Sequence, residues 1–251
     1  MDESIKKEPL GNDFFVYVSP HHTFGTDAVV LSHFARPKKK ERYIDLGTGC
    51  GIIPLLILRD NPKIDAVGVD ISKEAISLAE KTVSELRLKN FKPMHCDLLD
   101  LKGKIEFGCH SLITCNPPYK APDAGLKNPD KTVMVARHEV ACTLEDIVRV
   151  SAKLLQTGGR LCMCQRPERL SEMMTFFSAY KIEPKRLRLV CQRKGEEPWL
   201  VLLEGRRCGN TGLRIEPTLY VEENGSFSDE MIALYGAYKQ AYLKNGDCDE
   251  R

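Results

Sequence analysis

The chain has 251 residues, of which 42% are hydrophobic and 29% are charged, and its formal net charge is only +2. This size and composition suit one large α/β domain, and so small a charge does not by itself identify a nucleic-acid-binding protein. No apolar run approaches the roughly 18 residues that cross a membrane, and the first residues lack the apolar segment of a signal peptide. We therefore expect a cytoplasmic, monomeric, non-membrane protein with a single domain over residues 1–251 and a core at about residues 24–205.

Hydrophobic periodicity predicts strands and helices that alternate along most of the chain. The expected strands lie at 14–18, 43–46, 65–70, 92–97, 111–115, 160–165, 186–191 and 199–203, the last two as an antiparallel pair. The expected helices lie at 25–35, 52–59, 72–88, 143–155 (ended by Gly158 and Gly159), 170–180 and from Ser228 onward. Such alternation predicts a doubly wound α/β fold. Its sheet would be mostly parallel and seven-stranded, with helices on both faces and an antiparallel edge strand.

A glycine-rich turn follows the strand expected at 43–46. It contains Gly47, Thr48, Gly49 and Gly51, and an apolar helix begins directly after it. Glycines allow a tight turn and let the backbone approach a ligand closely, as at the first strand–helix junction of doubly wound folds. The spacing differs from the G-x-G-x-x-G of dinucleotide-binding proteins. Asp45, just before the first glycine, suits a cationic or amine-bearing ligand better than a pyrophosphate.

Polar side chains end four successive strands of the expected sheet: Asp45, Asp70, Asp97 and Asn116. An Asp at a strand end is often the N-cap of the next helix, and for Asp97 alone that interpretation is equally good. Four such residues in succession favour a ligand site at the carboxyl edge of the sheet. An acid at the position of Asp70 accepts hydrogen bonds from ribose hydroxyls in folds of this kind.

The fourth of these strand ends begins the turn Asn116-Pro117-Pro118-Tyr119. Each proline fixes φ and removes an N–H, and each restricts the residue before it. The turn therefore holds the Asn116 side chain and the Pro117 carbonyl as two fixed acceptors, with the Tyr119 ring beside them. Two acceptors and a ring are what an enzyme needs to grip the amino group of a planar nitrogen compound.

Other candidate sites are weaker. The ten cysteines include no C-x-x-C pair, and Cys162 and Cys164 share one face of an expected strand, so we expect no metal site. A polar segment at 120–138 follows the Asn-Pro-Pro-Tyr turn, and its length favours a substrate-binding loop. Arg137 and His138 at its end could contact phosphate, or they could pair with Glu139 or cap a helix. Basic residues at 181–194 could also serve phosphate contacts or be a solvated face.

These residues resemble the class I S-adenosylmethionine-dependent methyltransferases, which have a Rossmann-like fold. The Asn-Pro-Pro-Tyr turn narrows the resemblance to enzymes that methylate an sp² amino nitrogen. The segments Phe24 to Leu31, Asp45 to Pro54, Ala136 to Glu139 and Pro217 to Val221 resemble the bacterial tRNA1(Val) adenine-37 N6-methyltransferase family. This resemblance runs from about residue 10 to about residue 231. Lys120 departs from it, because the family commonly places an apolar or aromatic residue there.

The resemblance implies S-adenosylmethionine as cofactor, tRNA as partner and no metal. Asp70 would hold the ribose hydroxyls, Asp97 with the Leu98 backbone would bind the cofactor adenine, and Asp45 would hold the methionine ammonium or an ordered water. The implied cofactor-binding residues are Thr26, Asp45, Gly47, Thr48, Gly49, Gly51, Asp70, Ile71, Asp97, Leu98 and Asn116. The implied catalytic residues are Asn116, Pro117 and Tyr119, and the implied substrate-binding residues are Tyr119, Lys120, Arg137 and His138.

Three alternatives share the same turn or fold. A protein-glutamine N5-methyltransferase of release factors usually has a helical domain before the glycine turn, and here only about 40 residues precede it. In a ribosomal RNA guanine N2-methyltransferase the turn more often ends in Phe. A catalytically silent RNA-binding scaffold typically loses the glycines or the Asn, which this chain keeps.

Overall fold

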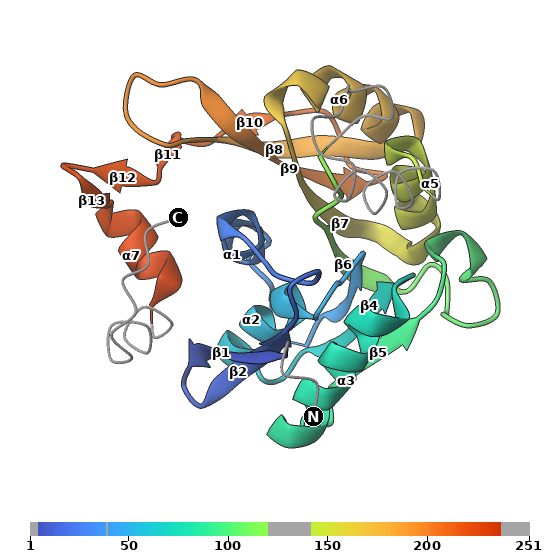
Figure 1. Ribbon diagram of the computed structural model, residues 1–251. Coiled ribbons are helices and arrows are strands. Elements are labelled where there is room, and N and C mark those ends of the chain that lie inside the picture. Colours follow the sequence, from blue (N-terminus) through green and yellow to red (C-terminus); the bar gives the residue numbers. More distant parts are fainter. Residues whose placement is uncertain (1–4, 39, 120–141, 237–251) are drawn as a thin grey trace, which may run out of the picture.

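The computed structural model describes residues 5–38, 40–119 and 142–236 (Figure 1). Lys120, Arg137 and His138 lie outside the described residues, as does any part of the C-terminal helix beyond residue 236. None of the helices in the described part is both long enough and apolar enough to cross a bilayer.

A nine-stranded sheet forms the centre of the fold, in the order β10-β8-β9-β7-β6-β3-β4-β5, with β11 also paired to β8. The strands β3 to β7 pair in parallel throughout. Chain order reverses between β3 and β6, so ligands are expected at the carboxyl ends of these two strands. The parallel strands are β3 (Arg42–Leu46), β4 (Asp65–Asp70), β5 (Phe91–His95), β6 (His110–Cys115) and β7 (Leu155–Gln165).

The expected antiparallel pair is confirmed as β8 (Ile182–Cys191) and β9 (Pro198–Arg207). The edge position expected for the antiparallel strand is wrong, because β9 lies between β7 and β8 and is antiparallel to both. Residues 200–203 are all fully buried, as a strand covered on both faces requires. The outer edge of β8 is covered by the short parallel strands β10 (Arg214–Ile215) and β11 (Leu219–Tyr220).

Helices cover both faces of the sheet, which confirms the doubly wound arrangement. Successive strand residues alternate between two cores: Leu112 belongs to the first and Ile113 to the second. By this alternation Asn116 continues the first face. That face packs against α1 (Thr26–Phe34), α2 (Ile52–Asp60), α3 (Lys73–Leu86) and the hairpin of β1 (Lys6–Gly11) and β2 (Phe14–Val18). The second packs against α5 (Leu144–Leu154) and α6 (Leu170–Ala179).

Short elements complete the described chain. The hairpin of β12 (Glu222–Glu223) and β13 (Ser226–Phe227) precedes α7 (Asp229–Tyr235), which packs beside α1. Ser228 caps α7 by accepting a hydrogen bond from the Met231 N–H. Two 3₁₀ turns, η1 (Leu98–Asp100) and η2 (Pro167–Arg169), follow β5 and β7.

The two glycines expected to end the helix at 143–155 have another role. Helix α5 ends at Leu154, and β7 begins at the next residue. Gly158, with φ of +78°, lies inside β7 where the register with β6 shifts. A Cβ on Gly159 would lie 2.8 Å from the His110 carbonyl oxygen. The glycines therefore form an irregularity in the strand rather than a helix cap.

A buried cluster of charged residues ties the carboxyl end of α1 to the sheet. The Arg160 guanidinium lies 3.1 Å from both Glu41 and Glu204, and Arg186 lies 2.6 Å from Glu204 and 3.0 Å from Glu216. The same guanidinium groups donate hydrogen bonds to the last carbonyls of the helix, Arg160 to Ala35 at 2.7 Å and Arg186 to Phe34 at 3.0 Å. Positive charge at a helix carboxyl end also complements its dipole.

Arg160→Ala should destabilise the fold strongly, because it leaves two buried carboxylates without their shared partner. Removing one member of a buried ion pair costs about 3–5 kcal/mol. The matched control is Arg193→Ala, since Arg193 is 58% exposed and its pairs with Glu196 and Glu222 lie at the surface, where such pairs contribute about 1 kcal/mol or less. Urea unfolding of both variants measures the difference, and equal free energies of unfolding would contradict a structural role for Arg160.

Candidate active site

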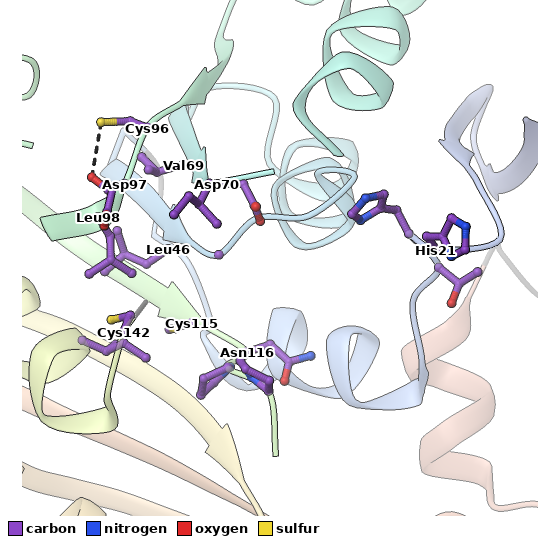
Figure 2. Close-up of a pocket in the computed structure, with 17 residues that line it drawn as sticks. His21, Leu46, Val69, Asp70, Cys96, Asp97, Leu98, Cys115, Asn116 and Cys142 are labelled. Atoms are coloured by element: carbon purple, nitrogen blue, oxygen red, sulfur yellow. Dashed lines mark hydrogen bonds between the residues drawn. The ribbon is translucent and has the colours of Figure 1, made fainter. Parts of the chain in front are cut away.

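A cavity of about 400 Å³ lies at the carboxyl edge of the sheet, at the reversal of strand order. Figure 2 shows Asp70 and Asn116 on opposite sides of it, with Asp97 and Leu98 toward one end and His21 toward the other. The ends of β3, β4, β5 and β6 therefore contribute to one cavity, although Asp45 does not line it. Of the predicted residues, those that line this cavity are Gly47, Asp70, Ile71, Asp97, Leu98, Asn116 and Pro117.

The glycine turn is open toward a ligand. Gly47 and Gly49 have φ of +71° and +55°, and a Cβ on either would meet nothing within 4 Å. Gly51 has φ of +86° and precedes α2, where a Cβ would lie 3.0 Å from the Phe91 ring. Thr48 is buried against Gly68 of the neighbouring strand. The turn thus needs glycine for its conformation, and its backbone faces free space.

Asp70 fixes the glycine turn to the start of α3. Its Oδ2 accepts a hydrogen bond from the Gly49 N–H and its Oδ1 accepts one from the Ser72 N–H, both at 2.8 Å. A carboxylate offers about four acceptor positions, so lone pairs remain for hydroxyl groups. Ile71, 40% exposed, lines the cavity beside it.

Asp97 is a helix cap that also lines the cavity. Its Oδ1 accepts a hydrogen bond from the Leu99 N–H at 2.8 Å and so caps η1, which confirms the capping interpretation. The residue also lines the cavity together with Leu98. A binding role for these two residues is compatible with the cap and stays a prediction.

Asp45 lies behind the cavity wall. It is fully buried, and its Oδ1 accepts a hydrogen bond from Thr114, whose hydroxyl lies 2.6 Å from that of Tyr43. Asp45 Oδ2 and Thr48 Oγ1 have no hydrogen-bond partner within the described ranges. Burial raises the pKa of Asp45 to about 7. The carboxyl and the threonine are thus a buried polar pair beneath the glycine turn.

Asn116 lies at the centre of a hydrogen-bonded group that joins three elements. Its Nδ2 donates to Asp27 Oδ2, on the first turn of α1, at 2.9 Å. Its Oδ1 accepts from the Tyr119 hydroxyl at 2.8 Å and from the Cys164 thiol of β7 at 3.0 Å. The Tyr119 hydroxyl also contacts Asp27, and the Arg166 guanidinium lies 4.9 Å from the centre of the Tyr119 ring.

Several cavity or site residues were missed by sequence reasoning. His21 and His22 line the cavity from the segment before α1, and Cys142 lines it from the segment before α5. Asp27 contacts Asn116 without lining the cavity. A sequence signal for Asp27 was present, because it lies in the Phe24 to Leu31 segment that carries the family resemblance.

Other predicted residues have different surroundings. Thr26 is not among the residues that line the cavity, and its Oγ1 lies 3.2 Å from the Tyr235 hydroxyl. Arg186 and Arg188, two of the basic residues considered for phosphate contacts, are committed to ion pairs with Glu204, Glu216 and Glu230. Across the described residues, no three His, Cys, Asp or Glu side chains are grouped so that they could hold a metal ion.

Comparison with solved structures defines the fold class as that of methyltransferases. A predicted O-methyltransferase from Agrobacterium tumefaciens has a TM-score of 0.70 and 17% sequence identity, over 85% of this chain and 97% of that one. A geranyl diphosphate methyltransferase solved with SAM has a TM-score of 0.54 and 14% identity, over 72% of this chain and 84% of that one. At these identities the likeness establishes the fold alone.

Comparison with sequences identifies the family. Residues 16–182 match the family model described as methyltransferase small domain. The chain belongs to this family and is a methyltransferase. A tRNA1(Val) (adenine(37)-N6)-methyltransferase of Porphyromonas gingivalis is 28% identical over 84% of this chain and 86% of its own length. One of the same name from Aeromonas hydrophila is 26% identical over 88% of this chain and 90% of its own length.

Asp45→Asn should change how stability depends on pH. The folded state holds a proton on Asp45 up to about pH 7, whereas the unfolded chain releases it near pH 4. Asp45 therefore stabilises the fold at low pH, and this contribution is lost as pH rises toward 7. From about pH 5 to about pH 7.5, wild type should lose about 1–3 kcal/mol of unfolding free energy relative to Asp45→Asn.

Urea unfolding at the two pH values measures this difference. Asp65→Asn is the control, because Asp65 is an exposed carboxylate at the other end of the neighbouring strand β4. A pH dependence that is the same in wild type and Asp45→Asn would show that Asp45 titrates normally in the folded protein.

Proposed function

We propose that this methyltransferase takes its methyl group from S-adenosylmethionine and transfers it to the exocyclic N6 of an adenine in tRNA, adenine 37 of a valine tRNA. The observation that carries the proposal is the position of Asn116, on the wall of the cavity that Gly47, Asp70 and Asp97 also line. An acceptor for an amino group and a site for the methyl donor thus share one cavity. The relatives named above support the choice of base and RNA. Such a substrate implies a cytoplasmic protein.

The cavity residues fit S-adenosylmethionine. The open space over Gly47 and Gly49 would let the backbone approach the methionine part, and the remaining lone pairs of Asp70 would accept from the ribose hydroxyls. Asp97 and Leu98 would hold the adenine. The buried Oδ2 of Asp45, which has no hydrogen-bond partner among the described residues, would be reached from the ammonium group through an ordered water.

When bound, S-adenosylmethionine supplies an electrophilic methyl group, so the residues of the chain must prepare the nucleophile. The adenine amino nitrogen is a poor one, because its lone pair is delocalised into the ring. Asn116 Oδ1 and the Pro117 carbonyl would each accept one amino hydrogen and turn the nitrogen lone pair toward the cavity. Positioning of this kind can lower a barrier by several kcal/mol. The two oxygen dipoles also stabilise the positive charge that develops on nitrogen.

The proposed role of Tyr119 is to stack on the target base, although its ring does not line the cavity in this structure. A base stacked on an aromatic ring gains roughly 1–3 kcal/mol, and Tyr119 adjoins both acceptors. The target base must first leave its own stack, which costs least in a single-stranded loop. No residue is required as a general base, since the proton can pass to water after methyl transfer.

Asn116→Ala should abolish methyl transfer while cofactor binding survives, because it removes an acceptor for the amino group and leaves Asp70 and Asp97 intact. Methyl transfer to unmodified tRNA and calorimetric titration with S-adenosylhomocysteine measure the two properties. Asn90→Ala is the control, since the Asn90 side chain donates to the Pro62 and Ile64 carbonyls at the opposite edge of the sheet. Near-normal turnover in Asn116→Ala would refute the proposed role.

Asp70→Ala should weaken cofactor binding by about tenfold or more, because a charge-assisted hydrogen bond contributes about 1.5–3 kcal/mol. The matched control is Asp65→Ala, at the amino end of the same strand and away from the cavity. Calorimetry with S-adenosylhomocysteine tests both variants. An affinity unchanged in Asp70→Ala would remove the ribose assignment.

Mass spectrometry of digested tRNA tests the substrate directly. Deleting the gene should remove N6-methyladenosine from one tRNA, and the wild-type gene should restore it where the Asn116→Ala gene does not. Unchanged tRNA would overturn the substrate assignment. Methylation lost instead from release-factor glutamine or ribosomal RNA guanine would identify the alternative enzyme classes.

A further inference from the structure

The side-chain amide of Asn116 has a donor end, Nδ2, and an acceptor end, Oδ1, and each end has different neighbours. The nitrogen end faces the Asp27 carboxylate at 2.9 Å. The oxygen end faces the Tyr119 hydroxyl at 2.8 Å and the Cys164 thiol at 3.0 Å. The Tyr119 hydroxyl also lies against Asp27 Oδ2, so its single hydrogen is shared between the carboxylate and Asn116 Oδ1. Burial raises the pKa of both Tyr119 and Cys164, so both groups stay protonated and can donate.

Only one orientation of this amide suits both the Asp27 carboxylate and the Cys164 thiol. An ionised carboxylate accepts hydrogen bonds and cannot donate them, so it requires the amide nitrogen. If the amide turned by 180°, its oxygen would face the carboxylate oxygen with no hydrogen between them, and its N–H groups would face the Cys164 thiol. An oxygen placed against a charged acceptor in a partly buried site costs more than a mismatch between neutral groups. Asp27 is therefore the strongest constraint on the orientation of Asn116.

We propose that Asp27 is a positioning residue for methyl transfer: its carboxylate holds the Asn116 amide with the oxygen free to accept a hydrogen of the target amino group. This inference rests on the proposed function, which gives Asn116 its acceptor role. An incoming amino group is a donor, as the Tyr119 hydroxyl is. It can replace that hydroxyl on Oδ1 while the contact between Nδ2 and Asp27 stays unchanged.

The local structure holds Asp27 itself in place. Its Oδ1 accepts a hydrogen bond from the Ala28 N–H at 2.9 Å, which leaves Oδ2 for Asn116. A Cβ on Gly25 would lie only 2.7 Å from Asp27 Oδ1, so glycine at position 25 makes room for this carboxylate. Its place in the first turn of α1 also favours negative charge through the helix dipole.

Steady-state kinetics distinguishes a positioning role of Asp27, which affects kcat, from a role in ligand binding, which affects KM and cofactor affinity. In Asp27→Ala, kcat should fall by about 10- to 100-fold, the effect of losing a hydrogen bond to a charged group. Asp27→Asn keeps an acceptor oxygen and should lie between Asp27→Ala and wild type. The affinity for S-adenosylhomocysteine and the KM for tRNA should stay within about twofold of wild type, because Asp27 contacts neither ligand in this arrangement.

Two further variants test whether kcat falls because the carboxylate is displaced or because the fold is damaged. Gly25→Ala keeps both Asp27 and Asn116 but displaces the carboxylate, so its kcat should also fall at unchanged cofactor affinity. Glu145→Gln is the matched control: Glu145 is likewise an acid in the first turn of a helix that accepts from a tyrosine hydroxyl, that of Tyr180 at 2.6 Å. Glu145 is exposed and does not line the cavity, so the kcat of Glu145→Gln should equal that of wild type.

Nuclear magnetic resonance of the free protein gives a readout independent of activity. With ¹⁵N-labelled asparagine, the side-chain NH₂ signal of Asn116 is assigned by its loss in Asn116→Ala. That signal should shift in Asp27→Ala and stay in place in Glu145→Gln. An unshifted signal, or a kcat in Asp27→Ala within about twofold of wild type, would overturn the positioning role. Absence of adenine methylation by wild type would instead refute the proposed function, and the amide signal would still decide whether Asp27 orients Asn116.

Discussion

The pairing of two guanidinium groups, one buried and one largely buried, with the carboxyl end of α1 is the contact on which the site depends. Arg160 and Arg186 each have carboxylate partners, and each also donates to a terminal carbonyl of the helix. Buried ion pairs contribute little net stability, because desolvation offsets their attraction, but they tolerate few alternative arrangements. These contacts fix the carboxyl end of α1, a helix of nine residues. The position of its amino end is thereby fixed too, and Asp27 lies there beside Asn116.

Because side chains alternate along the strands, Arg160, which anchors α1, and Asn116 lie on the same face of the sheet. Arg160, Cys162 and Cys164 of β7 share a face, and Thr114 and Asn116 continue that face from the neighbouring strand β6. Helix α1 covers this face, so the residues beneath it run from the charged anchor to the amide of Asn116. A one-residue slip of β7 would turn Arg160 and Cys164 to the other face together.

Sequence patterns predicted the features that depend on neighbouring residues in the chain, such as where each strand ends. The strand ends at Asp70, Asp97 and Asn116 could be located because strands have a period of two and a parallel sheet collects their carboxyl ends at one edge. The contact between Asn116 and Asp27 could not be predicted, since it joins residues 89 positions apart and depends on the angle at which α1 crosses the sheet. The position of β9 and the role of Gly158 were missed for the same reason: strand neighbours and register are tertiary properties.

The insertion of β9 between β7 and β8 also constrains how the chain is made. A ribosome releases β7, α6 and β8 before β9, so β7 has no partner on that side until the chain has passed Arg207. Until then two strands present unpaired backbone groups and apolar side chains, the condition under which nascent chains aggregate. Completion of the sheet, and with it the anchor that Glu204 of β9 provides for α1, is therefore a late event in synthesis. Chains that end before β9 should be ligands for chaperones rather than partly active enzymes.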